Sequence, residues 1–488
     1  MRRAPGRSAA TLALFVVVLF VAACTALPPP QEWLRTRPAP GGDRRGAVVG
    51  SELRARARAE EPLRRLAWQE AVRRARADNP TLAVVRQRVR RAEARVDEAR
   101  SLAYPSLDAR ASWVRFIDAA QFRGRTGTDV TGSETRTRLF TDSGTDIYTA
   151  GVDLSYPVFD GGESYFAREA ASAALEATRS DVVAATQQLE YLVFSAFIDV
   201  LLADGEIRIA EDALRFSEEQ ERRAGARADV GEGLRVDQLR FASRASNERF
   251  ALNTARARRL VRLVVLGELL DRTLDDDIEL VVPEAELEPP PGDDRVALAL
   301  ARRSELVALR ATRRELENVV KQERSAWWPA LNVFGSYGVI SLDDLALNQD
   351  EDELQVGAAL AWNLFEGGGT TARTRAALSD FMAVADEQRE LERTIEREVR
   401  DAEISFALAR ENIAVSQESV RLADEVLTRV TAQYEAGEAE VLDVTEADLA
   451  RTTAQLALLR SRVEVFRAQA RLRRAVGMEL VAPVASAD

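Results

Sequence analysis

The sequence has almost none of the side chains on which catalytic and metal chemistry most often depend. It contains no histidine and a single cysteine among 488 residues. Histidine is the commonest general base and metal ligand, so its absence removes the usual starting point for both kinds of site. The three methionines, Met1, Met382 and Met478, form no soft-metal motif. No nucleophile and base occur in a catalytic pattern, and we expect no enzyme, no cofactor and no metal.

Charge and aromatic content narrow the class of protein further. The formal net charge of -12 argues against nucleic acid as a partner. Aromatic residues make up only 6% of the chain and charged residues 30%, which favours long Ala-, Leu-, Arg- and Glu-rich helices over a dense globular core. An apolar content of 46% argues against a broadly disordered chain. With one cysteine, no intrachain disulfide can form.

That cysteine, Cys24, ends an N-terminal targeting pattern. Three arginines precede an apolar segment at residues 11–22, which is too short to span a membrane comfortably. The four residues that end at Cys24 resemble a bacterial lipobox, in which the peptide is cut before a cysteine that is then lipidated. We therefore expect a signal peptide at residues 1–23, lipidation of Cys24 and an N-terminal arm at residues 24–63. An ordinary signal peptide that happens to contain a cysteine is the alternative.

An internal repeat is the most informative feature that the sequence does have. A hydrophobic-acid-Gly-Gly turn occurs twice with a displacement of 206 residues, and a later glycine and aspartate recur at the same displacement. An aromatic-Pro motif, at Tyr104 and Trp328, recurs with a displacement of 224, so the intervening segment is 18 residues longer in the first copy. The recurring positions are Gly161 and Gly162 with Gly367 and Gly368, Gly231 with Gly437, and Asp237 with Asp443. Each copy contains two strand patterns and several very long helix patterns, and a catalytic domain is rarely built in this way.

The repeat divides the chain into four segments after the arm. These are repeat one at 64–270, a Pro- and acid-rich connector at 271–295, repeat two at 296–478, and a C-terminal tail at 479–488.

Each repeat contains two segments in which apolar and polar residues alternate. We predict strands at about 106–116 and 147–158 in repeat one, and at about 330–340 and 353–364 in repeat two. Such strands, with one apolar and one polar face, are typical of a membrane barrel with a wet lumen. For a single strand pair, a soluble hairpin with one buried face is the alternative. Four strands cannot close a barrel, and an open edge in lipid leaves backbone groups unsatisfied, so we expect the chain to oligomerise.

Helical spacing of apolar residues returns after each Gly-Gly turn. One apolar stripe consists of Leu189, Leu192, Val193, Ala196, Phe197, Val200 and Leu201, and the other of Ile404, Leu408, Val415, Leu422 and Val426. We predict long helices at about 163–229 and 370–434, and return helices at about 234–266 and 441–476. Each long helix would extend roughly 100 Å, so it must pack lengthwise on other helices. Shorter helices, Leu82–Ala103 and Leu306–Ala326, are expected to cover the length that the return helices leave.

This combination of strands, paired long helices and turns in two copies resembles the TolC-like outer membrane efflux protein family, lipoprotein branch, over about residues 66–477. The resemblance implies an α+β membrane protein in which a long antiparallel α-helical coiled-coil barrel continues into a transmembrane β-barrel. It also implies a homotrimer that contributes four strands per chain and extends from the outer membrane of a Gram-negative-type envelope into the periplasm. By the same resemblance, Thr25 after the cysteine favours retention in the outer membrane.

The resemblance also assigns roles to residues near the second tip turn. The family has a Tyr-x-x-Gly turn followed by two acidic residues one helical turn apart, which matches Tyr434, Gly437, Asp443 and Glu446. It implies that Asp443 and Glu446 surround a closed periplasmic gate, together with Asp237 and Tyr434. The alternative is a solvated helix start, where acidic residues complement the helix dipole.

One position departs from the family pattern. The best-known member of the family carries an arginine two residues after the tip glycine, where it helps to latch the entrance, and this chain has Ala439. Arg235 is close enough in sequence to the other tip to substitute for it.

The function that the resemblance implies is a passive outer-membrane duct of a tripartite efflux system. Its partners would be a periplasmic adaptor protein, an inner-membrane efflux transporter and outer-membrane lipid, and its cargo small molecules. A duct for type I protein secretion is the alternative within the same class. A lipid-anchored periplasmic coiled-coil scaffold without a channel is the alternative of a different class, but a scaffold has no need for four strands with an apolar face.

Overall fold

The structure is a computed structural model that describes residues 64–115, 146–282, 290–292, 294–342 and 352–480. The chain divides into two units, Met1–Leu63 and Arg64–Asp488, and all the described residues belong to the second. The expected signal peptide, Cys24 and the N-terminal arm therefore lie outside the described residues, as does most of the expected tail.

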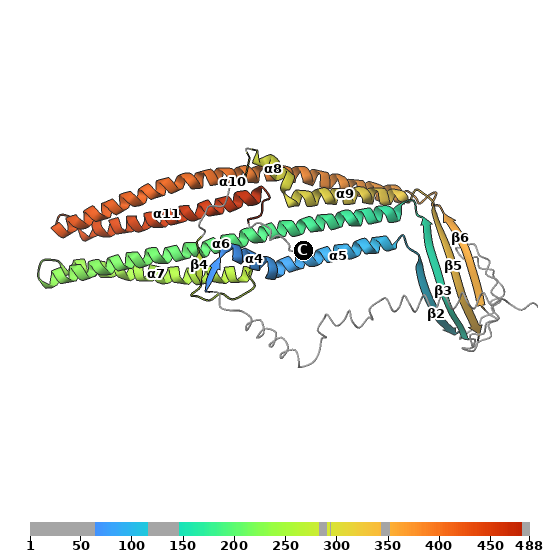
Figure 1. The fold of residues 1–488 in the computed structure, drawn as a ribbon, viewed down its shortest axis with the longest axis horizontal. Coiled ribbons are helices and arrows are strands. Elements are labelled where there is room, and N and C mark those ends of the chain that lie inside the picture. The colour runs from blue at the N-terminus through green and yellow to red at the C-terminus, as the bar shows by residue number, and fades with distance from the viewer. Residues whose placement is uncertain (1–63, 116–145, 283–289, 293, 343–351, 481–488) are drawn as a thin grey trace, which may run out of the picture. The chain divides into compact units, whose positions relative to one another are not determined.

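Two long helical hairpins dominate the second unit (Figure 1). They consist of α6 (Glu163–Asp229) with α7 (Arg235–Leu269), and α10 (Gly369–Ala436) with α11 (Val441–Ala475). The shorter helices are α4 (Trp68–Asp78), α5 (Pro80–Ser101), α8 (Arg295–Arg302) and α9 (Ser304–Ser325). No helix among these described residues combines the length and the apolar character needed to cross a membrane.

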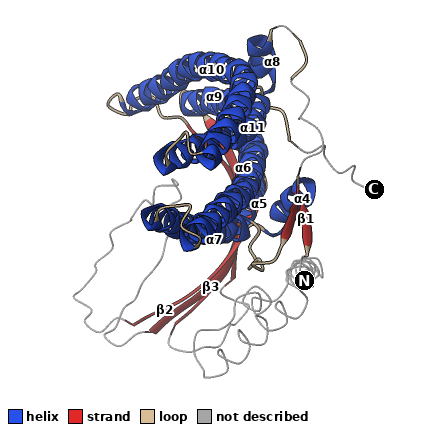
Figure 2. Ribbon diagram, turned by 90° about the vertical axis from the view of Figure 1, so that its left-hand side faces the viewer, coloured by secondary structure: helices blue, strands red, loops and turns tan. Residues whose placement is uncertain are grey.

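The helices of this unit lie side by side in one curved layer (Figure 2). Toward the tips, α7 packs along α6, α6 along α11, and α11 along α10. Toward the sheet, α5 packs along α6, α6 along α9, and α9 along α10. One edge of the layer is therefore α10 throughout, and the opposite edge is α5 near the sheet and α7 near the tips.

The four main strands form one antiparallel sheet in the order β2-β3-β5-β6. The strands are β2 (Ser106–Arg115), β3 (Asp146–Phe159), β5 (Ala330–Leu342) and β6 (Asp352–Ala361). The register obeys the sequence repeat, because the pair Leu107 and Leu154 in repeat one corresponds to the pair Leu331 and Leu360 in repeat two. This order leaves β2 and β6 as the edge strands of the sheet.

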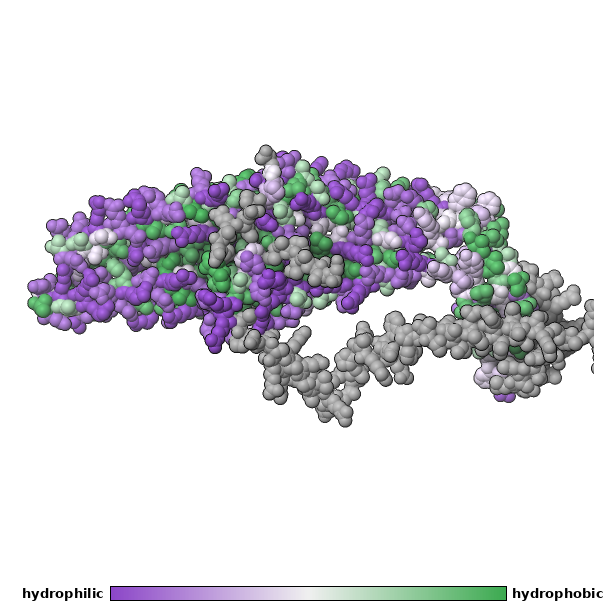
Figure 3. All heavy atoms as spheres, in the orientation of Figure 1, coloured by the Kyte–Doolittle hydropathy of each residue, from purple (hydrophilic) through white to green (hydrophobic). Residues whose placement is uncertain are grey.

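The alternating pattern places apolar side chains on one face of the sheet, where they are exposed (Figure 3). Leu154 and Val356 on this face are 45% and 78% exposed. The other face is polar: Arg110 lies 3.5 Å from Asp153, and other polar pairs join neighbouring strands. An apolar face left open to the surroundings is the arrangement that lipid contact requires.

Two details of the strands differ from the sequence prediction. The last strand was expected to reach residue 364, but β6 ends at Ala361, the partner of Ala330. Pro329 precedes Ala330 and has no N–H to continue the ladder, and the indole N–H of Trp362 instead donates to the Trp327 carbonyl at 3.1 Å. The prediction also missed a short parallel pair, in which β1 (Arg65–Ala67) pairs with β4 (Glu279–Val281) of the expected connector.

The two predicted apolar stripes differ in burial. In α6 the buried face differs from the predicted stripe. Leu192 of the stripe is 41% exposed, whereas Phe194 and Ile198, outside the stripe, are buried. The ring of Phe194 meets Trp68 of α4 edge to face at 5.2 Å, so a second helix covers this side. In α10 the entire stripe from Ile404 to Val426 is exposed within the chain.

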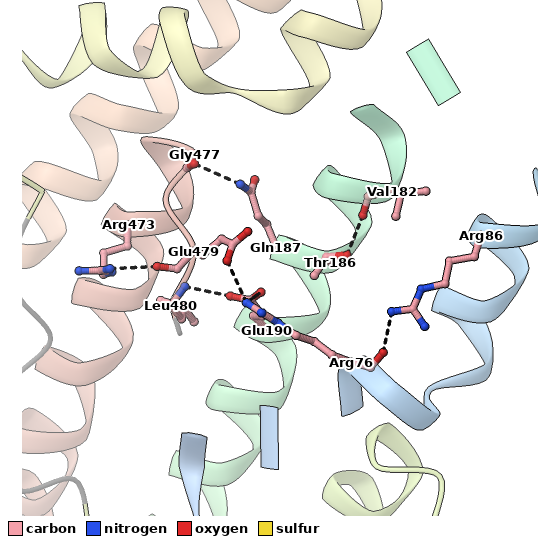
Figure 4. Close-up of polar contacts among 10 residues, drawn as sticks. All are labelled: Arg76, Arg86, Val182, Thr186, Gln187, Glu190, Arg473, Gly477, Glu479 and Leu480. Carbon is pink, nitrogen blue, oxygen red and sulfur yellow. Dashed lines mark hydrogen bonds and ion pairs between the residues drawn. The ribbon is translucent and has the colours of Figure 1, made fainter. Parts of the chain in front are cut away.

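A buried polar cluster joins the residues after α11 to repeat one (Figure 4). Glu190 of α6 is 1% exposed, pairs with Arg76 of α4 and accepts from the backbone N–H of Leu480 at 2.9 Å. Arg76 also reaches Glu479 at 3.1 Å. Burial raises the pKa of Glu190, while the Leu480 N–H and the Arg76 charge oppose the rise. The cluster fixes the second repeat against the first near the middle of the helical layer.

Candidate functional site at the helix tips

The two tip turns have the same backbone geometry. In repeat one the N–H of Gly231 donates to the Ala228 carbonyl at 3.2 Å, and the next N–H reaches back to Arg227. In repeat two the N–H of Gly437 donates to the Tyr434 carbonyl at 3.1 Å, and the next N–H reaches back to the Gln433 carbonyl at 2.8 Å. Both glycines have a positive φ, 79° and 80°, which explains why glycine occupies these positions. The Gly-Gly turns at the sheet, Gly161–Gly162 and Gly367–Gly368, also have positive φ values.

The candidate gate carboxylates lie at the start of α11. The Asp443 carboxylate accepts the backbone N–H of Glu440 at 2.9 Å, and the Glu440 side chain caps Asp443 in return. Asp443 and Glu446 are both exposed, and neither forms an ion pair among the described residues. Asp443 therefore stabilises the helix start, as the alternative interpretation expects, and both carboxylates also remain accessible to ions.

Tyr434 connects the two hairpins. Its ring meets Phe241 of α7 edge to face at 5.9 Å, and the Arg227 guanidinium lies 5.8 Å from the ring centre. Burial raises the pKa of Tyr434, the charge of Asp237 adds to the rise, and Arg227 opposes it. The structure thus brings Asp237 and Tyr434 of the candidate gate together, with Tyr434 half-buried in the hairpin contact.

The arginines that hold the tips together were missed by the sequence analysis. Arg223 of α6 pairs with Glu435 at 3.0 Å, and Arg227 donates to the Glu435 backbone carbonyl at 2.9 Å. Arg235 lies 4.0 Å from Asp229 of its own hairpin. Arginines four residues apart near the end of a long helix were the available signal. Glu435 is exposed, yet it takes part in the contact between the hairpins.

A second contact between the hairpins is buried. Arg244 of α7 lies 2.6 Å from Glu248 and 3.4 Å from Asp448 of α11, which is 1% exposed. Burial raises the pKa of Asp448, and Arg244 opposes this rise while Glu248 adds to it. The sequence signal was an acidic residue in phase with the buried Val441 and Val444. One guanidinium therefore holds two buried carboxylates and ties the return helices to each other.

These contacts concentrate charged side chains at the tips of the two hairpins. In the part of the chain that the structure describes, no group of three His, Cys, Asp or Glu residues is arranged to hold a metal ion.

Comparison with known proteins identifies the family. The sequence matches the outer membrane efflux protein family over residues 71–271 and 296–478. The chain belongs to this family. The prediction of the family, of an outer-membrane location and of an efflux channel is thereby confirmed.

Individual proteins are similar to the chain over most of its length. It is 25% identical to outer membrane efflux protein BepC of Brucella suis biovar 1 over 335 residues, which are 67% of this chain and 72% of BepC. It is 28% identical to alkaline protease secretion protein AprF of Pseudomonas aeruginosa over 362 residues, which are 72% of this chain and 74% of AprF. The solved structure of outer membrane protein VceC of Vibrio cholerae superimposes with a TM-score of 0.72 at 18% identity, covering 85% of this chain and 97% of VceC. The predicted fold class is confirmed by this likeness.

Proposed function

We propose that the chain is one protomer of a homotrimeric outer-membrane duct that passively exports small molecules. The duct receives them from an inner-membrane transporter through a periplasmic adaptor protein. The main support for the proposal is that the sheet and the helical layer each end in two unpaired edges. These are β2 and β6 in the sheet, and α10 and the opposite α5–α7 side in the layer. The number three comes from the family resemblance.

The two Gly-Gly turns support a head-to-tail assembly. A Cβ at Gly161 would lie 2.7 Å from the Ser325 carbonyl and 2.8 Å from the Trp328 Cβ, because the turn after α9 packs against it. A Cβ at the equivalent Gly367 would meet no atom of the described residues within 4 Å, its two chain neighbours aside. The turn that would fill this space by repeat symmetry is the one after α5, which ends at the 67% exposed Tyr104. In a ring, the α5 turn of the next protomer occupies it.

The same symmetry gives a register for the strands at the boundary between protomers. Within the chain, Val152 of β3 pairs with Tyr337 of β5. In the other repeat, the equivalent of Val152 is Ala358 (displacement 206) and the equivalent of Tyr337 is Trp113 (displacement 224). The repeat symmetry therefore pairs Ala358 of β6 with Trp113 of β2 in the next protomer. Both of these residues lie on the apolar face, so the register continues one lipid-facing surface around the barrel. A heterologous contact of this kind closes into a ring and removes the sheet edges.

Disulfide trapping tests this register. One residue along from the Ala358–Trp113 pair, Ala359 should pair with Ser112 of the next protomer on the polar face. Ala359→Cys with Ser112→Cys should therefore give dimer and trimer bands on mild oxidation. The matched control is Leu360→Cys with Ser112→Cys, whose side chains point to opposite faces. A chain that stays monomeric in both variants, or a ladder that continues past the trimer, would contradict the proposed assembly.

The entrance to the duct is proposed to lie at the tips. Asp443 and Glu446 are exposed carboxylates one helical turn apart, and three copies would place six such groups around one axis. A ring of carboxylates attracts cations and repels anions. Tyr434 and Asp237 are proposed to hold the two hairpins of each protomer in the closed arrangement.

The lipid anchor is proposed at Cys24 after removal of residues 1–23. Metabolic labelling with a clickable fatty acid tests it, because Cys24→Ser should abolish the label. Equal labelling of the wild type and the variant would disprove the lipobox interpretation.

Protein secretion is the second candidate function. The similarity to AprF, named as an alkaline protease secretion protein, supports it, whereas BepC is named as an efflux protein. A strain that lacks the chain separates the two. Higher retention of a fluorescent dye supports small-molecule efflux, and loss of a secreted polypeptide with normal dye retention supports secretion.

A further inference from the structure

A pocket of about 510 Å³ lies where the helical layer meets the sheet. It opens between the end of α9 and the start of α10, and none of the functions above uses it. Its walls consist of Arg324, Trp327, Trp328, Thr371, Thr374, Arg375 and Leu378. Two guanidinium groups, two indole rings and two hydroxyl groups therefore converge on one space.

The two arginines of this pocket form no ion pair with the described part of the chain. No carboxylate of the described residues lies within ion-pair distance of Arg324 or Arg375, and both side chains are exposed. The hydroxyl oxygen of Thr374 is shielded from solvent and has no hydrogen-bond partner among the described residues. The pocket thus offers positive charge and a hydroxyl group that no contact within the described chain satisfies.

Repeat one provides an internal comparison. Arg100, the equivalent of Arg324, lies 3.4 Å from Asp97. The equivalent of Arg375 is Glu169, which pairs with the neighbouring Arg168 at 3.1 Å. Arg100 and Arg168 therefore have carboxylate partners, whereas Arg324 and Arg375 have none among the described residues. Since both repeats build the same junction, the fold itself does not require unpaired arginines there.

The position of the pocket suggests the source of its ligand. Trp327 and Trp328 are 52% and 65% exposed and lie directly before β5, whose apolar face is open. Trp362, at the end of β6, is 58% exposed and donates to the Trp327 carbonyl. Exposed tryptophans at the end of apolar strands mark the boundary between hydrocarbon and headgroups. Arg324 belongs to α9 and Arg375 to α10, so both arginines lie on the helical side of these tryptophans.

We propose that this pocket binds the phosphate of a phospholipid in the periplasmic leaflet of the outer membrane. The two guanidinium groups pair with the phosphodiester oxygens, which suit the planar donor geometry of arginine. The tryptophan rings pack beside the glycerol and the upper acyl chains. This inference rests on the barrel lying in the outer membrane, and not on what the duct carries.

Native mass spectrometry of the full-length protein in mild detergent tests the proposal, with phosphatidylglycerol as the added probe. The wild type should retain about one phosphatidylglycerol per chain. Arg324→Gln with Arg375→Gln should reduce retention at least tenfold, since each basic group near an anionic lipid surface contributes about fivefold. The matched control, Arg100→Gln with Arg168→Gln, removes two arginines at the same level of repeat one and should retain lipid normally. Far-UV circular dichroism on heating checks that both variants remain folded.

Three outcomes would overturn the proposal. Equal retention in the test and control variants would show that the arginines are only solvated. Competition by millimolar inorganic phosphate would indicate a site for the free ion. Retention of a co-purifying polypeptide in place of lipid would indicate a protein partner at this surface. The experiment counts bound lipid per chain, so its result does not depend on whether the duct conducts. The lipid site can therefore be disproved while the proposed function stands, and the reverse.

Discussion

At the scale of single residues, two equivalent positions at the ends of the return helices carry different side chains. Asp271 after α7 has a φ of 52°, and its repeat-two equivalent, Gly477 after α11, has a φ of 78°. A left-handed backbone is strained for a residue with a Cβ, so Asp271→Gly should stabilise the protein by about 1 kcal/mol. Thermal unfolding followed by circular dichroism measures this. Gly477→Asp should destabilise it, because a Cβ there would lie 3.2 Å from the Arg302 backbone. If the two substitutions changed the stability in the same direction, this account of the two positions would be wrong.

The cluster around Arg244 supports a second prediction at this scale. Arg244→Gln removes the guanidinium that the buried Glu248 and Asp448 share and should cost about 3 to 5 kcal/mol at pH 7. Because burial already holds the pKa of Asp448 above its ordinary value, protonation at lower pH should relieve part of the cost. The loss should therefore shrink as the pH falls toward 5, measured by thermal unfolding. The control Asp448→Asn removes one carboxylate and should flatten the pH dependence. A loss that does not depend on pH would contradict this account.

At the scale of elements, the start of α11 tests the gate. Asp443 both caps the helix and carries charge, so alanine would confuse the two effects. Asp443→Asn with Glu446→Gln keeps the hydrogen-bonding shape and removes six carboxylates from a trimer. Block by divalent cations in planar bilayers at low salt should weaken roughly tenfold, because a ring of carboxylates attracts cations. Glu438→Gln, in the exposed turn, should leave the block unchanged; Glu435 is unsuitable as a control because it pairs with Arg223. Identical block in the wild type and the double variant would mean that the carboxylates only start a helix.

The elements also show how far the sequence could predict this molecule. The change from helical to alternating spacing at Pro105 and Pro329, and the return to helical spacing after each Gly-Gly turn, are local signals, and the predicted helices and strands followed from them. The fold class came from the family resemblance that their arrangement carries. The β1–β4 pairing and the end of β6 depend on which strand lies alongside, which no local pattern encodes. The hairpin contacts of Arg227 and Arg244 depend on how two helices face each other across about two hundred residues of sequence. The sequence could therefore place Tyr434 at the tip but could not show that its partners are Arg227 and Phe241.

At the scale of the whole molecule, the exposed apolar stripe of α10 argues for assembly. It lies at one edge of the helical layer, and the opposite edge near the tips is α7, where Phe250 and Val261 are 75% and 64% exposed. In a ring, the stripe of one protomer would pack against α7 of the next. Such a contact would bury these apolar side chains, which the single chain exposes to the aqueous periplasm.

Val415, in the middle of the stripe, provides the test. It is 64% exposed within the chain, so Val415→Glu should leave the protomer folded. In the assembly it would bury an unpaired carboxylate, which costs several kcal/mol at each of the three interfaces. Mass measured in mild detergent should therefore change from a trimer of about 150 kDa to a monomer of about 50 kDa. Gln417→Glu places the same charge on another exposed side of α10 and should leave the trimer intact. A trimer that survives Val415→Glu would mean that the barrel strands alone hold the protomers together and that the α10 stripe faces something other than a second copy of the chain.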